Sequence, residues 1–215
     1  MTGDLVTALA DLKEDEALEI TRQRLVSGDD PHGILSDARK GMSIVGDRFA
    51  KGEYFIPDLI YSGEILKQVT SLVKPKLVSS SVQEKKLGKV VLGTVAGDIH
   101  DIGLNIVDFM LDTNGFEVFN LGVDVPPQKF VEKVRETGAP IVGLSGFLTL
   151  AFDSMKETVQ ALKEAGLRDK VRIMIGGGQI DEQVRIYTGA DAYGTDAMAA
   201  VSLAKKWTAD KQAVN

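Results

Sequence analysis

The residues best suited to chemistry in this chain lie together in the run GDIHDIGLNIV, residues 97–107. Only two histidines occur among the 215 residues, and one of them, His100, lies two residues after Asp98. A neutral imidazole can bind a metal ion through one ring nitrogen while the other donates its N–H to a carboxylate, which fixes the tautomer. The spacing therefore indicates a metal-ligating histidine supported by Asp98. A loop histidine with ordinary hydrogen bonds is the alternative.

Protein side chains alone would not complete such a metal site. The chain contains no cysteine, and the second histidine, His32, lies in the other half of the sequence. A closed zinc or iron site would need carboxylates for nearly all of its remaining ligands. A single protein nitrogen suits a metal whose other positions are already filled by a macrocycle.

Two further segments are suited to holding a ligand. Residues 145–149, SGFLT, place hydroxyl groups beside apolar side chains, and residues 176–178 are glycines, which let a ligand approach the backbone closely. A nucleotide is a poor alternative, because Gly93, Gly97 and Gly103 lack the G-x-G-x-x-G spacing and no G-x-x-x-x-G-K-[ST] loop occurs. A phosphoacceptor receiver domain would need an acidic pair after its first strand and a lysine after its last, and neither is in place.

The elements that must position these residues alternate along the second half of the chain. Short apolar runs predict five strands, and a stretch with helical spacing follows each of them. The strands are expected at 89–95, 116–122, 140–146, 171–177 and 190–194, and the helices at 102–114, 126–137, 151–165, 181–188 and 195–209. This alternation predicts a doubly wound α/β domain, Rossmann-like or flavodoxin-like, with a five-stranded parallel sheet. Ligands bind such sheets at the carboxyl ends of the strands, where the three segments above lie.

The first half of the chain has helical spacing and hardly any strand signal. Apolar residues recur every three to four positions up to about residue 75, and Pro31 and Pro57 stand where helices can begin. These helices predict an all-α bundle. The polar run SSSVQEKKLG follows it, so we predict a helical bundle over 1–78, a linker over 79–88 and the α/β domain over 89–215.

The charge and composition exclude several kinds of partner. The formal net charge of −6 argues against a surface that follows nucleic-acid phosphates. No run approaches the roughly 18 apolar residues that cross a membrane, and the acidic N-terminus has no targeting pattern. The absence of cysteine fits a reducing compartment. We therefore expect a cytoplasmic protein without nucleic-acid or membrane partners.

Four segments follow one another in an order typical of a known family. Residues 98–103 match the D-x-H-x-x-G signature of cobalamin-binding domains, such as that of methionine synthase, that hold the cofactor with its own base displaced. Ser145 opens an S-x-L region, and Gly176 and Gly177 form a glycine pair. Residues 46–59, GDRFAKGEYFIPDL, are similar to the G-x-x-F…G-E-x-F-[IL]-P segment of a helical bundle. Over nearly its whole length the chain resembles the corrinoid proteins of methylamine, methanol and methoxyarene methyltransferase systems.

The resemblance implies a role for each of these positions. His100 would be the lower axial ligand of the cobalt in cobalamin, and Asp98 would hydrogen-bond the other ring nitrogen. Ser145 and Thr149 would contact the displaced nucleotide tail, beside an apolar wall made by residues 147–148. The full set of implied cofactor contacts is Thr94, Gly97, Asp98, His100, Asp101, Ile102, Gly103, Ser145, Phe147, Leu148, Thr149, Gly176 and Gly177.

Three positions depart from the pattern of the family. Phe147 occupies the third S-x-L position and Leu148 follows it, so the contact with the tail would shift by one residue. Ala151 stands where some relatives have a second serine, so we expect no proton relay of that length to Asp98. Leu104 stands where many relatives have lysine, and nothing in the sequence explains it.

Most apolar positions of the helical bundle are expected to form its core. The resemblance implies that the remainder would form a cap over the methyl-carrying face of the corrin. The candidate cap residues are Met42, Phe55, Ile56 and Leu59. The linker would let such a cap swing aside when a partner enzyme binds.

The function implied by the resemblance is that of a non-catalytic methyl carrier. Cobalt would cycle between Co(I), which takes a methyl group, and methyl-Co(III), which gives it up. The implied partners are a substrate-specific methyltransferase, a second methyltransferase acting on tetrahydrofolate or a thiol coenzyme, and a reductive activase. Two alternatives stay open: the small subunit of an adenosylcobalamin mutase, which would generally lack the bundle, and a cobalamin-dependent sensor, which would need a basic DNA-binding arm.

Overall fold

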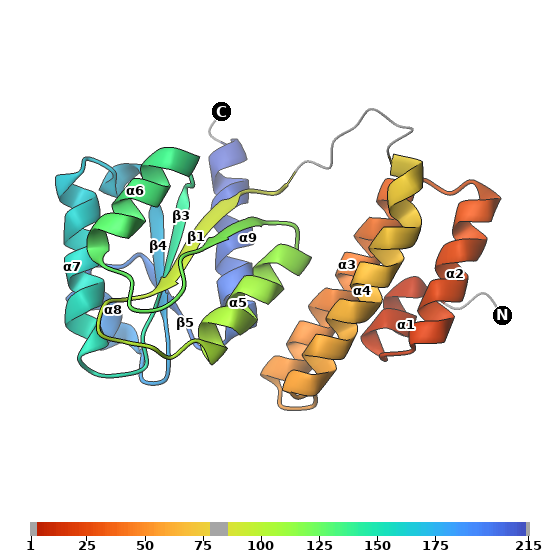
Figure 1. Ribbon diagram of the computed structural model, residues 1–215, viewed down its shortest axis with the longest axis horizontal. Coiled ribbons are helices and arrows are strands. Elements are labelled where there is room, and N and C mark those ends of the chain that lie inside the picture. The colour runs from red at the N-terminus through yellow and green to blue at the C-terminus, as the bar shows by residue number, and fades with distance from the viewer. Residues whose placement is uncertain (1–3, 78–85, 214–215) are drawn as a thin grey trace. The chain divides into compact units, whose positions relative to one another are not determined.

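The computed structural model describes residues 4–77 and 86–213, and the chain divides into two compact units, Met1–Lys85 and Lys86–Asn215 (Figure 1). Residues 79–85 of the predicted linker lie outside the described residues. The first unit is helical and the second contains the sheet, as the change in sequence pattern predicts. No helix within the two described ranges is long and apolar enough to cross a membrane.

The helical unit begins and ends its helices at residues whose types favour those positions. It consists of α1 Leu5–Ala10, α2 Glu14–Ser27, α3 Pro31–Ala50 and α4 Ile56–Leu77. Helix α2 ends at Gly28, whose φ of 83° is a left-handed value that glycine tolerates. Asp30 accepts hydrogen bonds from two backbone N–H groups in the first turn of α3, and Pro31 occupies a position whose N–H would have no helical partner.

The core of the helical unit contains two of the four candidate cap residues. Met42 is 0% exposed and Leu59 is 3% exposed, so both side chains pack inside the unit. This corrects the candidate set, because helical periodicity marks an apolar stripe without showing which of its members face other helices. Phe55 and Ile56 are exposed at the start of α4, and they remain the candidates for a cap surface.

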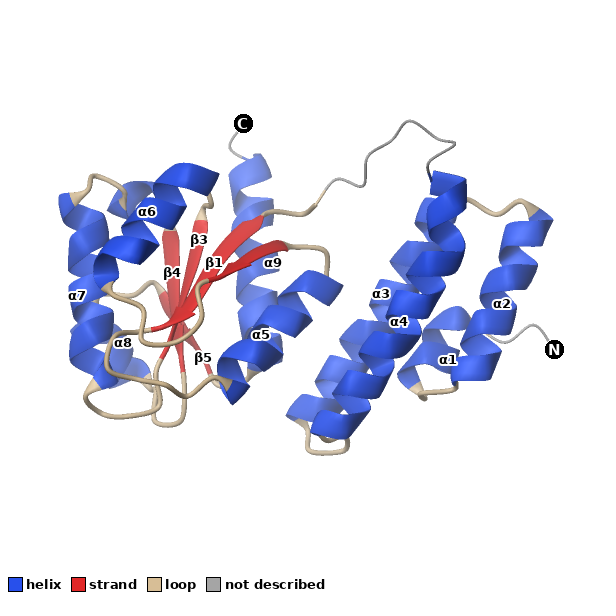
Figure 2. Cartoon of the chain, viewed as in Figure 1, coloured by secondary structure: helices blue, strands red, loops and turns tan. Residues whose placement is uncertain are grey.

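The α/β unit alternates strands and helices as the sequence predicts (Figure 2). Its strands are β1 Lys89–Thr94, β2 Glu117–Asn120, β3 Ile141–Ser145, β4 Arg172–Gly176 and β5 Ala192–Gly194. Its helices are α5 Ile102–Thr113, α6 Pro127–Thr137, α7 Ala151–Glu164, α8 Glu182–Thr188 and α9 Ala197–Ala213, with a 3-10 turn at Arg168–Lys170. Helices α6, α7 and α8 cover one face of the sheet and α5 and α9 the other (Figure 1), which confirms the doubly wound fold.

The strand order brings the three predicted ligand-binding segments together. The sheet is parallel throughout, in the order β2-β1-β3-β4-β5. Thr94 is paired with Ser145, and Ser145 with Gly176, so β1, β3 and β4 end at the same level. β2 lies on one side of β1, whereas β3 and the later strands lie on the other side, so the strand order reverses at β1. Open parallel sheets bind ligands at such a switch point.

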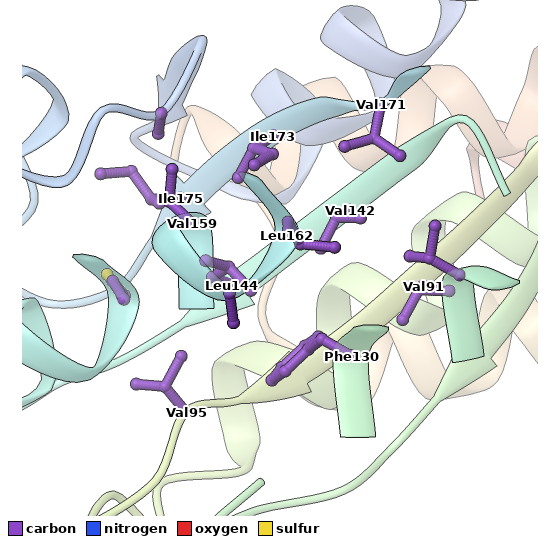
Figure 3. Packing of buried hydrophobic residues seen from close by; sticks show 14 of the residues in the cluster. Val91, Val95, Phe130, Val142, Leu144, Val159, Leu162, Val171, Ile173 and Ile175 are labelled. Atoms are coloured by element: carbon purple, nitrogen blue, oxygen red, sulfur yellow. The ribbon is translucent and has the colours of Figure 1, made fainter. Parts of the chain in front are cut away.

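An apolar cluster packs the sheet against the helices of one face (Figure 3). Val142, Leu144 and Ile173 project from neighbouring strands and are buried together with Phe130 of α6 and Leu162 of α7. Fully burying one such side chain contributes roughly 1.5–3 kcal/mol. The packed sheet is thus a stable base for the loops that leave the carboxyl ends of its strands.

Candidate functional site

The carboxylate of Asp98 joins two loops across the switch point of the sheet. Asp98 is 1% exposed, in the loop after β1. Its Oδ2 accepts hydrogen bonds from the backbone N–H groups of Phe147, at 2.6 Å, and Leu148, at 3.0 Å, both in the loop after β3. Its Oδ1 accepts the backbone N–H of His100 at 3.0 Å. One buried side chain therefore fixes both loops relative to each other.

The same carboxylate orients the imidazole of His100. Nδ1 of His100 lies 2.6 Å from Oδ1 of Asp98. An ionised carboxylate only accepts, so Nδ1 carries the hydrogen and the neutral ring keeps its lone pair on Nε2. The side chain of His100 is 49% exposed, and no residue within the described ranges hydrogen-bonds to Nε2. The geometry expected of a ligating histidine and its supporting carboxylate is thus present.

The hydrogen bonds to Asp98 decide its protonation state. Burial by itself raises the pKa of this carboxyl, but donation from the N–H groups of Leu148, His100 and Phe147 and from the His100 ring outweighs that effect. The pKa of Asp98 is therefore held well below its ordinary value. The carboxylate stays ionised at neutral pH, which keeps the hydrogen of the imidazole on Nδ1.

We expect the α/β unit to lose stability in acid because of Asp98. The pKa of Asp98 is lower in the folded protein than the value of about 3.9 in an unfolded chain, so the unfolded state binds the proton more tightly. The stabilisation is present above about pH 4 and is lost as the pH falls below it. Urea unfolding of the cofactor-free protein, followed by the fluorescence of Trp207 in α9, measures this loss. Asp98→Asn should have a smaller pH dependence, and parallel curves for the two proteins would contradict the assignment.

Two residues support the backbone around His100. Thr94 is fully buried, and its hydroxyl donates to the carbonyl oxygen of His100 at 2.9 Å. The family resemblance implied that Thr94 contacts the cofactor. In the structure, its hydroxyl forms a hydrogen bond that holds the loop. Asp124, which we did not predict, has a left-handed φ of 52°; its Oδ1 accepts the N–H of Gly97 at 2.8 Å and its own N–H donates to the carbonyl of Asp98 at 2.9 Å. The one feature of the sequence that could have identified Asp124 is its place in the loop after β2.

The glycines predicted to contact the cofactor differ in what surrounds them. A Cβ added to Gly97 or Gly103 would meet no atom within 4 Å, so both positions leave open space beside the backbone. A Cβ on Gly177 would collide with the backbone of Gly146, and the carbonyl of Gly176 accepts the N–H of Gly146 at 3.1 Å. Gly177 therefore also allows the loops after β3 and β4 to pack closely, while a Cβ on Gly176 would meet only the carbonyl oxygen of Gly194 at 3.7 Å.

The remaining predicted contacts lie around these loops with different exposure. Ser145 is half-buried at the end of β3, while Leu148 and Thr149 are exposed in the loop that follows. Ile102, in the first turn of α5, is exposed. Asp101 stands at the N-cap position of α5, where its side chain accepts no capping hydrogen bond from the backbone.

The structure accounts for one of the three departures from the family pattern and places the other two in or beside the loop after β3. Leu104 is 3% exposed, so this position of α5 faces the interior, where an apolar side chain is favoured. Ala151 is buried at the start of α7, and a Cβ on Gly146 would lie 2.6 Å from its Cβ. Ala151 therefore fills the space directly beside the loop after β3. Phe147, the third departure, packs against the ring of His100.

Comparison with known proteins agrees with this fold over both units. Two family models, each described as a B12 binding domain, match residues 88–202 and residues 3–74. Trimethylamine corrinoid protein 1 of Methanosarcina acetivorans is 37% identical over 196 residues, which cover 91% of each chain. A corrinoid protein of Desulfitobacterium hafniense strain Y51 is 37% identical over 208 residues, which cover 96% of each chain.

Solved structures give the same result. The crystal structure of a cobalamin-binding protein from Desulfitobacterium hafniense DCB-2 has a TM-score of 0.81 and 43% identity, and the match covers 94% of this chain and 96% of that one. A chain of the methanol:cobalamin methyltransferase complex from Methanosarcina barkeri has a TM-score of 0.79 and 27% identity, with 97% and 79% covered. The arrangement of Asp98 and His100 at the switch point, the two family models and these relatives agree, and the chain belongs to the family of corrinoid proteins with B12 binding domains.

Proposed function

We propose that this protein binds cobalamin with the cofactor's own base displaced, that Nε2 of His100 is the lower axial ligand of cobalt, and that the loaded protein carries methyl groups between two methyltransferases. The observation that supports this most directly is the hydrogen bond between Nδ1 of His100 and the buried, ionised Asp98. It leaves Nε2 with a free lone pair on a ring that is half exposed.

The residues around His100 fit the proposed cofactor. The open space beside Gly97 and Gly103 would let the cofactor approach the backbone closely at these two positions. Ser145 and Thr149 would offer hydroxyl groups to the displaced nucleotide tail, and Leu148 an exposed apolar contact. When bound, cobalamin supplies a cobalt centre that accepts a methyl group and passes it on. The chain contributes a ligand of fixed tautomer, whose basicity the carboxylate of Asp98 raises.

The partners that we propose follow from the relatives. Those relatives include trimethylamine and dimethylamine corrinoid proteins and a chain of the methanol:cobalamin methyltransferase complex. We therefore propose a substrate methyltransferase as the first partner, with a methylamine, methanol or a methoxyarene as its methyl donor. The second partner would transfer the methyl group to tetrahydrofolate or a thiol coenzyme, and a reductive activase would restore oxidised cobalt. A cytoplasmic location fits the absence of cysteine from the chain.

The helical unit has an exposed apolar surface suited to the proposed role of a cap. Phe55, Ile56, Ile60 and Tyr61, in and just before the first two turns of α4, are all exposed. Apolar side chains that gather on a surface mark a binding site. We propose that this surface covers the methyl-carrying face of the corrin and turns away when a methyltransferase binds. The presence of this unit also favours a methyl carrier over a mutase subunit, which would generally lack it.

Anaerobic methyl transfer tests the proposal. The holo-protein is reduced and mixed with isotope-labelled methyl donors and their methyltransferases, and the label bound to the corrinoid of the carrier is measured. We expect uptake from one class of donor, followed by release to a second methyltransferase and its acceptor. The variant His100→Ala provides the matched protein without the proposed ligand. Activity with only an adenosyl form of the cofactor would replace this proposal by the mutase subunit.

A further inference from the structure

The aromatic ring of Phe147 packs against the imidazole of His100. The two ring centroids are 4.6 Å apart and the planes are tilted by 33°. Phe147 is 51% exposed, so the contact is not a consequence of burial in the core. The backbone N–H of the same residue donates to Oδ2 of Asp98 at 2.6 Å. Phe147 is therefore in contact with both members of the Asp98–His100 pair, through its backbone and its side chain.

The loop after β4 leaves room for this ring. A Cβ on Gly178 would overlap the ring of Phe147, with Cδ2 only 2.6 Å away. Any residue other than glycine would therefore move the ring, and a moved ring would change its contact with His100. The loop after β3 is in turn held close to the loop after β4, because Gly177 has no side chain to meet the backbone of Gly146. Gly178 and Phe147 thus form a matched pair across two loops.

The hydrogen bond to Asp98 alone does not fix the plane of the imidazole. It sets the direction of Nδ1, but the ring can still tilt about the line that joins Nδ1 to Oδ1. An aromatic neighbour at 4.6 Å restricts that tilt, because aromatic pairs favour particular orientations. A ligand held in its binding orientation before the cofactor arrives loses less freedom on binding, and this increases affinity.

We propose that Phe147 is a positioning residue that holds the imidazole of His100 in its ligating orientation, with Gly178 supplying the space that its ring needs. This role differs from a contact with the nucleotide tail, which the family pattern implies for the position. It rests on the proposed function of His100 as the cobalt ligand. The contact between the two rings belongs to the protein without cofactor, so it can be tested independently of that function.

Histidine-ring nuclear magnetic resonance of the cofactor-free protein gives the first test. The chain has only two histidines, so His32→Gln assigns the His100 signals. Phe147→Leu and Gly178→Ala should both shift the ring signals of His100, because the aromatic ring is lost or displaced. Phe147→Tyr, which keeps the aromatic ring, should leave the His100 signals close to their wild-type positions. Ile186→Ala removes an exposed apolar side chain of α8 and should leave them unchanged.

Cobalamin binding gives the second test. Phe147→Leu should bind about fivefold more weakly, which corresponds to about 1 kcal/mol. Electron paramagnetic resonance of the Co(II) form with 15N-labelled protein should show that a smaller fraction of the cofactor has a nitrogen ligand from the protein. Unchanged His100 signals and unchanged affinity in Phe147→Leu would overturn the proposal. If the wild-type protein did not bind cobalamin at all, the proposed function would fail, while the cofactor-free spectra would still show whether the ring of Phe147 packs against His100.

The double variant Phe147→Leu/Gly178→Ala tests the matched pair. Leucine is smaller than the phenylalanine ring, so the added methyl group at position 178 should cost less in this background than it costs alone. We expect the effects on the His100 signals and on affinity to be smaller than the sum of the single effects, as for residues in contact. Additive effects would show that Gly178 has no part in positioning the ring.

Discussion

The variant His100→Ala is expected to keep the α/β unit folded and to lose the nitrogen ligand of the bound corrinoid. The ring is half exposed, and the backbone of residue 100 keeps its hydrogen bonds to Asp98 and Thr94 without it. Replacing a supporting carboxylate commonly lowers metal affinity about 10- to 100-fold, and loss of the ligand itself should cost at least as much. Binding titrations with cobalamin measure the affinity, and electron paramagnetic resonance of the Co(II) form with 15N-labelled protein distinguishes a protein nitrogen ligand from the nitrogen of the cofactor's own base.

The second histidine provides the control for this experiment. His32 lies in α3 of the helical unit, outside the loops at the ends of the strands. His32→Gln should therefore keep the nitrogen signal of the Co(II) form and the wild-type affinity. A nitrogen ligand from the protein that persists in His100→Ala, identified by 15N labelling of the protein, would remove His100 from its proposed role and with it the central element of the site.

Asp98→Ala is expected to have the largest effect on stability. The substitution leaves the backbone N–H groups of Phe147, Leu148 and His100 without their acceptor in a site where the carboxylate was 1% exposed. A buried donor left unpaired costs about 1–3 kcal/mol, and three backbone donors lose their acceptor here. We therefore expect the free energy of unfolding of the α/β unit to fall by about 3–5 kcal/mol. Cobalamin affinity should also fall, because the imidazole is no longer oriented.

Urea unfolding followed by the fluorescence of Trp207 measures this effect in the unit that contains the site. The matched control is Asp112→Ala, which removes an exposed carboxylate paired with Lys86 at 3.0 Å. Such an exposed pair contributes at most about 1 kcal/mol. Equal losses in the two variants would show that Asp98 does not hold the two loops together.

The sequence by itself determined the elements and the local part of the site. The alternation of strand and helix patterns predicted the doubly wound unit, because the side-chain periods of strands and helices differ and can be recognised in short windows. The contact between Asp98 and His100 could also be predicted from the sequence, because residues two positions apart in one loop lie close together in any fold. The spacing of these residues was therefore enough to predict that they form a hydrogen-bonded pair, which the structure contains.

Only the tertiary structure decided which residues support that pair. Asp98 accepts hydrogen bonds from residues about fifty positions away, and Phe147 reaches the His100 ring from a loop that the sheet order places beside it. The hydrogen bonds of Thr94 and Asp124 with the backbone of this loop also depend on the tertiary structure. Periodicity shows which face of an element is apolar, but it does not show what lies opposite. For that reason Leu104 had no explanation until the structure placed it in the interior.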